Sequence, residues 1–266
     1  MLNVKQHIGT SNIVLMTFDS LRFDVAQMAL EAGMTPNLAK LLPSGAWELR
    51  HSPASFTYPA HHAFFTGFLP TPVQAPKKVR LFAARFSAND TTGKNTFVFD
   101  EASLPEALAA RAYRTICIGG VAFFSMRDAV SRTLPGLFQE RYWRPRFGPS
   151  SSKASQAQVD CALRCLSEHP LQQRVFLFIN FSAPHHPSHI FLAGAHEDSV
   201  ETQMAALVSI DEELPRLFRA LRAFGDCLVI ACSDHGTTFG EDGYHGHRLA
   251  HPHVWNVPYA EFVLEA

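Results

Sequence analysis

The segment NIVLMTFDS, at Asn12–Ser20, is an apolar run that ends in an acid. The segment CLVIACSDHG, at Cys227–Gly236, repeats this pattern near the other end of the chain. Short continuous apolar runs are typical of strands that are buried on both faces of a parallel sheet. We therefore predict strands at Asn12–Phe18 and Asp226–Cys232 in an α/β fold.

Apolar runs alternate with helical patterns along the rest of the chain. The further predicted strands are Thr96–Phe99, Thr115–Gly119, Val175–Phe181 and a last segment near Pro258–Leu264. The predicted helices are Thr35–Leu42, Pro59–Phe65, Leu104–Arg111, Lys153–Ser167 and Glu201–Phe224. Such an alternation predicts a three-layer α/β/α sandwich with a mostly parallel central sheet.

Length and composition indicate a globular chain with one large core, since 47% of the 266 residues are hydrophobic and 18% are charged. We expect a single domain over residues 1–266. Two stretches break the alternation, at about 70–95 and at 121–152. Long connections of this kind are often functional loops or lids, although a surface for a partner explains them equally well.

The net charge is −1, whereas proteins that bind a nucleic-acid duplex or a membrane surface usually carry an excess of basic residues. The N-terminal apolar run, Ile13–Phe18, has only six residues and ends in an acid, unlike a signal peptide. No other stretch approaches the roughly 18 apolar residues of a membrane-spanning helix. The cysteines number five, so we expect reduced thiols in a cytoplasmic protein and interpret Cys161 and Cys165 as packing residues. The oligomeric state does not follow from the sequence.

Acids stand at the ends of two of the predicted buried strands. Asp19 follows Asn12–Phe18 and Asp234 follows Asp226–Cys232, and ligands gather at the carboxyl ends of parallel strands. A buried carboxylate needs a cation, a helix cap or an ion pair. His235 follows Asp234 directly, and the two together offer oxygen and nitrogen ligands to one divalent ion, although a simple turn is the alternative.

A hydroxyl residue stands just before a predicted helix in SFTYPAHHAFFTG, Ser55–Gly67. We expect Thr57 to be the N-cap, because Pro59 suits the first helical turn. The free N–H groups and the dipole of a helix start favour an anion there. A threonine alkoxide stabilised by a metal ion would suit this place, and a plain cap is the alternative.

Together, these motifs resemble the alkaline phosphatase superfamily, and within it the sulfatase-like hydrolases and the nucleotide pyrophosphatase/phosphodiesterases. NIVLMTFDSLRFDVA and TPNLAKLL look like the family's opening strand and following helix, and SDHGTTFGEDGYHGH with VWNVPYAEFVL resembles its closing signature. The motifs resemble those of a compact bacterial group of sulfatase-like hydrolases. The resemblance implies an alkaline-phosphatase-like fold in which Asp19, Thr57, Asp234 and His235 bind metal.

The nucleophile motif departs from that of sulfatases, in which a Cys/Ser-x-Pro-x-Arg motif precedes a Thr-Gly pair ten residues after the nucleophile. Thr57 and His61 replace the Cys and Arg here, and Gly67 keeps the spacing. A threonine cannot be oxidised to the formylglycine aldehyde of sulfatases, so phosphate-type esters are favoured over sulfate esters. Ser20 replaces a second acid, which favours zinc or manganese over magnesium or calcium.

Histidines in APHHPSH and GYHGHRLAHPH supply the other candidates. By resemblance, His185 contacts the ester oxygens or the leaving group, and His247 is a second-metal ligand or the leaving-group acid. One or two divalent ions are therefore expected. The full set of candidates is Thr57, His185 and His247 as catalytic residues; Asp19, Thr57, Asp234, His235 and His247 as metal ligands; and His61, His185, Arg248 and His251 as substrate-binding residues.

Basic and aromatic residues supply weaker candidates. Arg22, Lys77, Lys78 and Arg85 could contact nonbridging oxygens, although a solvated charge is the better interpretation for the lysines. The segment FQERYWRPRFG, Phe138–Gly148, is interpreted either as a contact surface for a nucleoside or aryl group or as a lid or partner surface.

The resulting hypothesis is a metal-dependent hydrolase that acts on a small-molecule phosphate-type ester through a covalent threonine intermediate. Its substrate would be a phosphodiester, a phosphomonoester or a phosphonate ester. The alternatives are a sulfatase, a phospho-group transferase or mutase of the same superfamily, and a catalytically silent metal-binding interaction protein.

Overall fold

A sheet of seven strands runs through the centre of the computed structural model, which describes residues 2–67, 82–84, 97–99, 102–168 and 173–266. The strand order is β2-β11-β8-β1-β7-β5-β6. The bounds are β1 Asn12–Phe18, β2 Glu48–His51, β5 Arg114–Ile118, β6 Glu140–Tyr142, β7 Val175–Phe181, β8 Cys227–Ser233 and β11 Asn256–Leu264. The five strands from β8 to β6 are parallel, whereas β11 and β2 are antiparallel to their neighbours.

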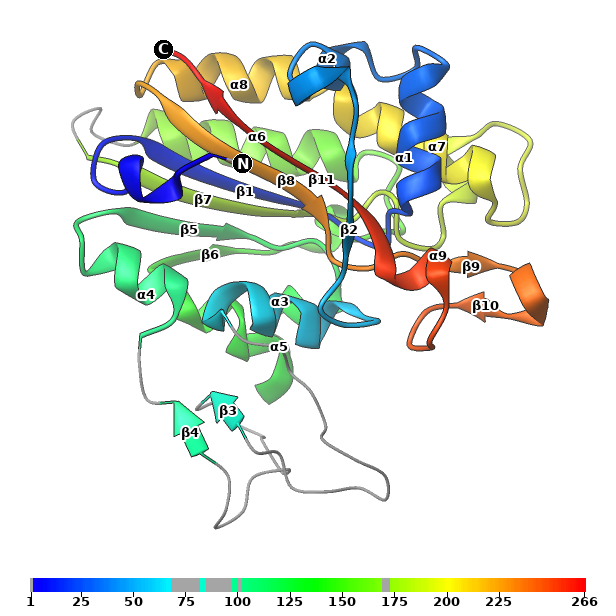
Figure 1. Cartoon of the computed structure of the whole chain (residues 1–266), viewed down its shortest axis with the longest axis horizontal. Helices are drawn as coiled ribbons and strands as arrows, with labels where there is room; N and C mark the ends of the chain where they lie inside the picture. The colour runs from blue at the N-terminus through cyan, green and yellow to red at the C-terminus, as the bar shows by residue number, and fades with distance from the viewer. Residues whose placement is uncertain (1, 68–81, 85–96, 100–101, 169–172) are drawn as a thin grey trace.

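Helices cover both faces of this sheet (Figure 1). One face carries α1 Phe23–Glu31, α2 Pro36–Ala39, α6 Ala154–Ser167, α7 Val200–Asp211 and α8 Leu214–Arg222. The other carries α3 Thr57–Thr66, α4 Leu104–Ala109 and α5 Ala129–Thr133. This arrangement confirms the predicted three-layer α/β/α sandwich.

Smaller elements lie outside the sheet. The short strands β9 Thr238–Phe239 and β10 His245–Gly246 pair with each other near α9 Pro252–Trp255. A separate two-stranded sheet pairs β3 Phe82–Ala84 with β4 Phe97–Phe99. Most of the predicted loop at about 70–95, with Lys77, Lys78 and Arg85, lies outside the described residues.

Strand β1 supplies side chains to both halves of the core because successive residues point to opposite faces. Val14, Met16 and Phe18 pack in the cluster beneath the larger helical layer. Ile13 and Leu15 pack in the opposite cluster, which is rich in phenylalanine. All seven residues of β1 are buried, as the continuous apolar run predicted.

Two sequence predictions are corrected by the fold. The single helix predicted at Glu201–Phe224 is wrong, because α7 ends at Asp211 and α8 begins at Leu214 with Pro215 in its first turn. Proline cannot donate the backbone hydrogen bond that a continuous helix needs. The stretch 121–152 is not only loop, since β6 pairs in parallel with β5 and α5 covers the phenylalanine-rich face.

The elements that escaped prediction include α1, β2 and β6. The two strands are short polar sequences at the edges of the sheet, where no alternation of apolar residues marks them. None of the helices in the described ranges is long and apolar enough to cross a membrane.

Candidate active site

Asp19 and Asp234 follow neighbouring parallel strands at equivalent positions, because Phe18 of β1 pairs with Ser233 of β8. The ligand atoms of Asp19, Asp234 and His235 lie within 4.8 Å of one another, and all three side chains are buried. Residues 215 positions apart in the chain thus form one cluster at the carboxyl ends of the sheet.

Thr57 lies at the start of α3 with its hydroxyl directed at this cluster. Its Oγ1 is 3.4 Å from Oδ2 of Asp19 and 3.3 Å from Nε2 of His235. The predicted N-cap role is wrong, because Phe56 has the extended backbone of the cap and Thr57 is the first helical residue. The hydroxyl makes no cap hydrogen bond, so it is available to the site.

Asn180, in β7, orients Asp19 and was not predicted. Its Nδ2 donates to Oδ2 of Asp19 at 3.1 Å and to Oγ1 of Thr17 at 3.2 Å. The sequence carried a signal, because Asn180 is the polar residue inside the apolar strand VFLFINF. A buried amide inside a strand requires hydrogen-bond partners, and here these are Asp19, a candidate metal ligand, and Thr17 of β1.

His61 lies behind Thr57 and extends the hydrogen-bond chain that begins at Asn180. Its Nδ1 donates to the carbonyl oxygen of Thr57 at 2.8 Å, so Nε2 can accept from the Thr17 hydroxyl at 3.1 Å. Burial lowers the pKa of His61 to about 4, which keeps the ring neutral. The expected contact of His61 with substrate is wrong: the fully buried ring packs against phenylalanines and positions Thr57.

The two carboxylates differ in their surroundings. Burial acts to raise the pKa of Asp19, but the charges of His185 and His235 and the Asn180 hydrogen bond lower it below its usual value. Burial and the charge of Asp19 raise the pKa of Asp234 well above its usual value. Oδ2 of Asp234 is buried and has no hydrogen-bond partner among the described residues. A divalent cation would satisfy this oxygen and offset the repulsion between the carboxylates.

His235 has the tautomer that a metal ligand requires. Its Nδ1 lies 2.8 Å from the carbonyl oxygen of Gly236 and donates to it, which leaves the Nε2 lone pair facing the cluster. Burial lowers the pKa of His235 to about 4, so the ring is neutral near pH 7. Two carboxylates, one imidazole and one hydroxyl form a donor set that fits zinc or manganese.

Three more histidines meet beside this cluster. The ligand nitrogens of His185, His186 and His247 lie within 4.8 Å of one another. His247 joins the two groups, because its ring centroid is 4.5 Å from that of His235. Burial, followed by the charges of His235 and His185, lowers the pKa of His247 to about 3. His186 was not among the predicted site residues, since nothing in the pair His185-His186 shows which ring faces inward.

A family model described as sulfatase matches residues 11–260 of the sequence. The chain belongs to the sulfatase family. This confirms the resemblance drawn from the motifs. No curated protein matches the sequence in a direct comparison.

Solved structures share the fold of this sulfatase-family chain at low sequence identity. The C-terminal periplasmic domain of phosphoethanolamine transferase EptC from Campylobacter jejuni has a TM-score of 0.65 at 11% identity, over 95% of this chain and 79% of that chain. The phosphonate monoester hydrolase of Agrobacterium radiobacter has a TM-score of 0.59 at 16% identity, over 94% and 68%. A protein in the alkaline phosphatase superfamily from Vibrio parahaemolyticus has a TM-score of 0.58 at 18% identity, over 95% and 60%.

A pocket of about 560 Å³ opens over Thr57 in this member of the sulfatase family. Its polar wall contains the three clustered histidines with Arg248 and Arg127, and its apolar wall includes Phe123 and Trp143. The guanidinium of Arg127 lies 4.7 Å from the ring centroid of Trp143. Aromatic and cationic side chains of the 121–152 stretch therefore line the approach to Thr57, next to residues of the family motifs.

Two predicted contacts lie elsewhere in this sulfatase-family fold. His251 caps α9, since its Nδ1 accepts from the backbone N–H of His253 at 3.1 Å, and its Nε2 pairs with Asp242. The structure therefore places His251 at the start of α9 and not among the residues that line the pocket over Thr57. Arg22 pairs with Asp24 and Glu241, each at 2.5 Å, so its guanidinium is already neutralised. Arg248 does line the pocket, and its guanidinium lies 4.9 Å from the ring centroid of Phe56.

Proposed function

We propose that this sulfatase-family chain is a metal-dependent hydrolase of phosphate-type esters with Thr57 as its nucleophile. The observation that carries the proposal is the position of Thr57 Oγ1. It lies at the pocket and within 3.4 Å of both Asp19 and His235. A hydroxyl beside two carboxylates and a neutral imidazole suits covalent catalysis assisted by a cation.

The identity of the nucleophile favours phosphorus over sulfur. Oxidation of the secondary alcohol of Thr57 would give a ketone, so the formylglycine route of sulfatases is closed to it. Two similar structures, the phosphoethanolamine transferase and the phosphonate monoester hydrolase, are named for phosphorus groups. The substrate we propose is a small-molecule phosphodiester, phosphomonoester or phosphonate ester.

Asp19, Asp234 and His235 would hold the divalent ion, with Thr57 completing the donor set. Zinc or manganese suits these ligands best. When bound, the ion would lower the pKa of the Thr57 hydroxyl and stabilise negative charge on the phosphoryl oxygens. His247, with His186 beside it, is the candidate ligand for a second ion, whereas His185 of the same cluster is left free to donate a proton.

The chain's own groups account for the remaining steps. Thr57 Oγ1 bonds to phosphorus as its proton leaves to solvent, while the bond to the leaving oxygen breaks and His185 donates a proton to that oxygen. A water molecule then attacks the phosphothreonine and gives a proton back to His185. The bond from phosphorus to Thr57 breaks, and the threonine recovers a proton from solvent.

An ester panel tests the proposal. With zinc or manganese, the purified protein should turn over phosphate mono- or diesters or phosphonates in preference to sulfates with the same leaving groups. Hydrolysis in ¹⁸O-water should place the label in the released phosphate. A preference for sulfates would overturn the proposal, as would transfer of the unlabelled group to an alcohol acceptor. No turnover of any ester with any metal would favour the silent metal-binding protein.

The variant His185→Asn should separate esters by leaving group. A lost proton donor costs about 10²–10⁴-fold when the leaving group is a basic alcohol, and little when it is an acidic phenol. We therefore expect a large loss of kcat for alkyl esters and a small one for nitrophenyl esters. His189→Asn is the matched control, because its ring pairs with Asp198 at 3.0 Å. An equal loss on both esters would refute the role of His185 as proton donor.

A further inference from the structure

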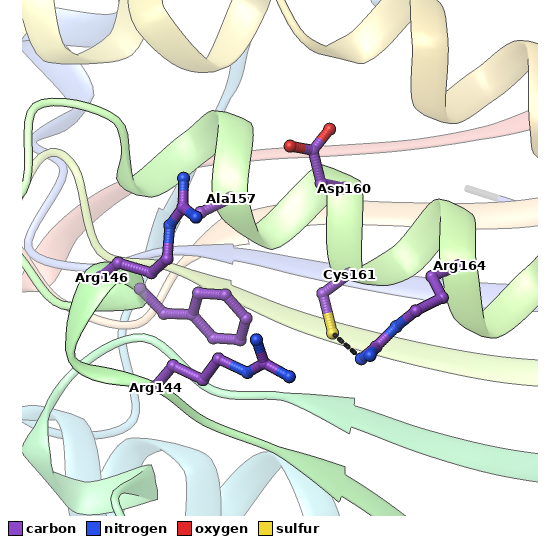
Figure 2. A pocket seen from close by; sticks show the side chains of 7 residues that line it. Arg144, Arg146, Ala157, Asp160, Cys161 and Arg164 are labelled. Carbon is purple, nitrogen blue, oxygen red and sulfur yellow. Dashed lines mark hydrogen bonds between the residues drawn. The ribbon is translucent and has the colours of Figure 1, made fainter.

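A second pocket, of about 210 Å³, lies between α6 and the segment that precedes it. Arg144 and Arg146 reach into it from that segment, while Cys161 and Arg164 come from α6 (Figure 2). The remaining lining residues are Phe147, Ala157 and Asp160. The arginine pocket, as we call it, shares no lining residue with the pocket over Thr57.

The arginine pocket concentrates positive charge in a chain whose net charge is only −1. No ion pair joins Arg144 or Arg146 to an acid within the described residues. Asp160, the carboxylate that lines the pocket, is engaged by Arg216 at 2.7 Å. Arg144, Arg146 and Arg164 are exposed, so solvent reaches their guanidinium groups at the rim of the pocket. An anion bound there would accept charge-assisted hydrogen bonds for which no carboxylate of the described residues competes at Arg144 or Arg146.

Cys161 lines the pocket in contact with the guanidinium of Arg164. The hydrogen bond from Cys165, followed by the hydrogen bond from Arg164 and the charges of Arg164 and Arg144, lowers the pKa of Cys161 to about 7. Nη2 of Arg164 lies 3.6 Å from its Sγ, the contact drawn in Figure 2. Thiolates are favoured beside arginine for the same reason that oxyanions are.

We infer that the arginine pocket is a second ligand site, which binds a phosphate-type oxyanion, either inorganic phosphate or the phosphate group of a small molecule. Arginine offers planar, paired N–H donors that match the oxygens of phosphate. A cavity of about 210 Å³ accommodates such a group between Arg144, Arg146 and Arg164. The inference is independent of the proposed hydrolase activity, because none of these residues lines the pocket over Thr57.

The two sites are close in the chain. Trp143, Pro145 and Gly148 line the pocket over Thr57, whereas Arg144, Arg146 and Phe147 line the arginine pocket. One short segment thus forms a wall of both pockets.

Equilibrium dialysis with radiolabelled inorganic phosphate tests the inference. The wild-type chain should bind one more equivalent of phosphate than the double variant Arg144→Gln/Arg146→Gln. This difference does not depend on phosphate bound in the pocket over Thr57, because both proteins share that pocket. Each single replacement should weaken this site by about tenfold or more, since a charge-assisted hydrogen bond contributes about 1.5–3 kcal/mol. Arg219→Gln, at an exposed arginine of α8, is the matched control and should leave the stoichiometry unchanged.

The Cys161 thiol locates the bound anion. Phosphate should slow alkylation of Cys161 by iodoacetamide, read by mass spectrometry at constant ionic strength, and should have no such effect in the double variant. Phosphoserine is tested in the same way, in the Thr57→Ala variant so that it is not turned over. If phosphoserine protects Cys161 from alkylation at a lower concentration than inorganic phosphate does, the ligand is a phosphorylated small molecule. If inorganic phosphate protects at the lower concentration, the ligand is free phosphate. Equal stoichiometry in wild type and double variant would overturn the inference, as would an equal loss in Arg219→Gln.

Discussion

Replacing Thr57 with alanine should lower kcat/KM by at least about a thousandfold on the best ester of the panel, since the covalent route then has no acceptor oxygen. The fold and the bound metal should survive, because the hydroxyl caps no helix and the two carboxylates with His235 remain. The measurements are steady-state kinetics, elemental analysis and the thermal unfolding midpoint of the purified variant.

Two other substitutions make the Thr57 result specific. Thr57→Ser keeps a hydroxyl at the same place and should retain turnover within about tenfold of wild type. Thr66→Ala, at the last residue of the same helix, removes a hydroxyl that bonds only the His62 carbonyl oxygen, and should leave kcat/KM unchanged. Acid quenching during turnover should trap phosphate on Thr57. Full activity of Thr57→Ala would end the assignment of this residue as the nucleophile.

Replacing Asp234 with asparagine should abolish both metal binding and turnover. Oδ2 of Asp234 is buried and has no hydrogen-bond partner among the described residues, and a neutral amide removes its charge. Wild-type protein at a metal concentration 100 times the Kd should gain about 2.7 kcal/mol of unfolding free energy, whereas the variant should gain little. Denaturant unfolding with and without zinc or manganese measures this difference.

The metal-free form of Asp234→Asn distinguishes a metal ligand from a structural carboxylate. Burial and the charge of Asp19 raise the pKa of Asp234, so the ionised carboxyl group is unfavourable without a cation. The metal-free variant should therefore be at least as stable as metal-free wild type. Glu212→Gln, at an exposed acid that follows α7, should keep the full response to metal. A metal response retained by Asp234→Asn would show that the carboxylate is no ligand.

The layers of the fold and half of the site follow from local sequence. A short continuous apolar run between polar segments is compatible with few structures other than a buried strand. The predicted bounds of β1, β7 and β8 therefore agree with the structure within one residue. The ends of parallel strands share one edge, which brought Asp19 and Asp234 together without knowledge of the strand order. The edge strand β6 could not be predicted, because its polar sequence takes its place from pairing with β5.

The amino-acid sequence by itself determined the α/β class, because continuous apolar runs mark the buried strands. It also predicted that Asp19, Thr57, Asp234 and His235 belong to one site, and the structure brings these four residues together. Tertiary structure alone decided the use of the remaining histidines. His61, His247 and His251 look alike in sequence, yet His61 is buried behind Thr57, His247 lines the pocket and His251 caps a helix. Those roles depend on which segments the sheet order brings together, and contacts between residues far apart in the chain leave no mark on the local pattern.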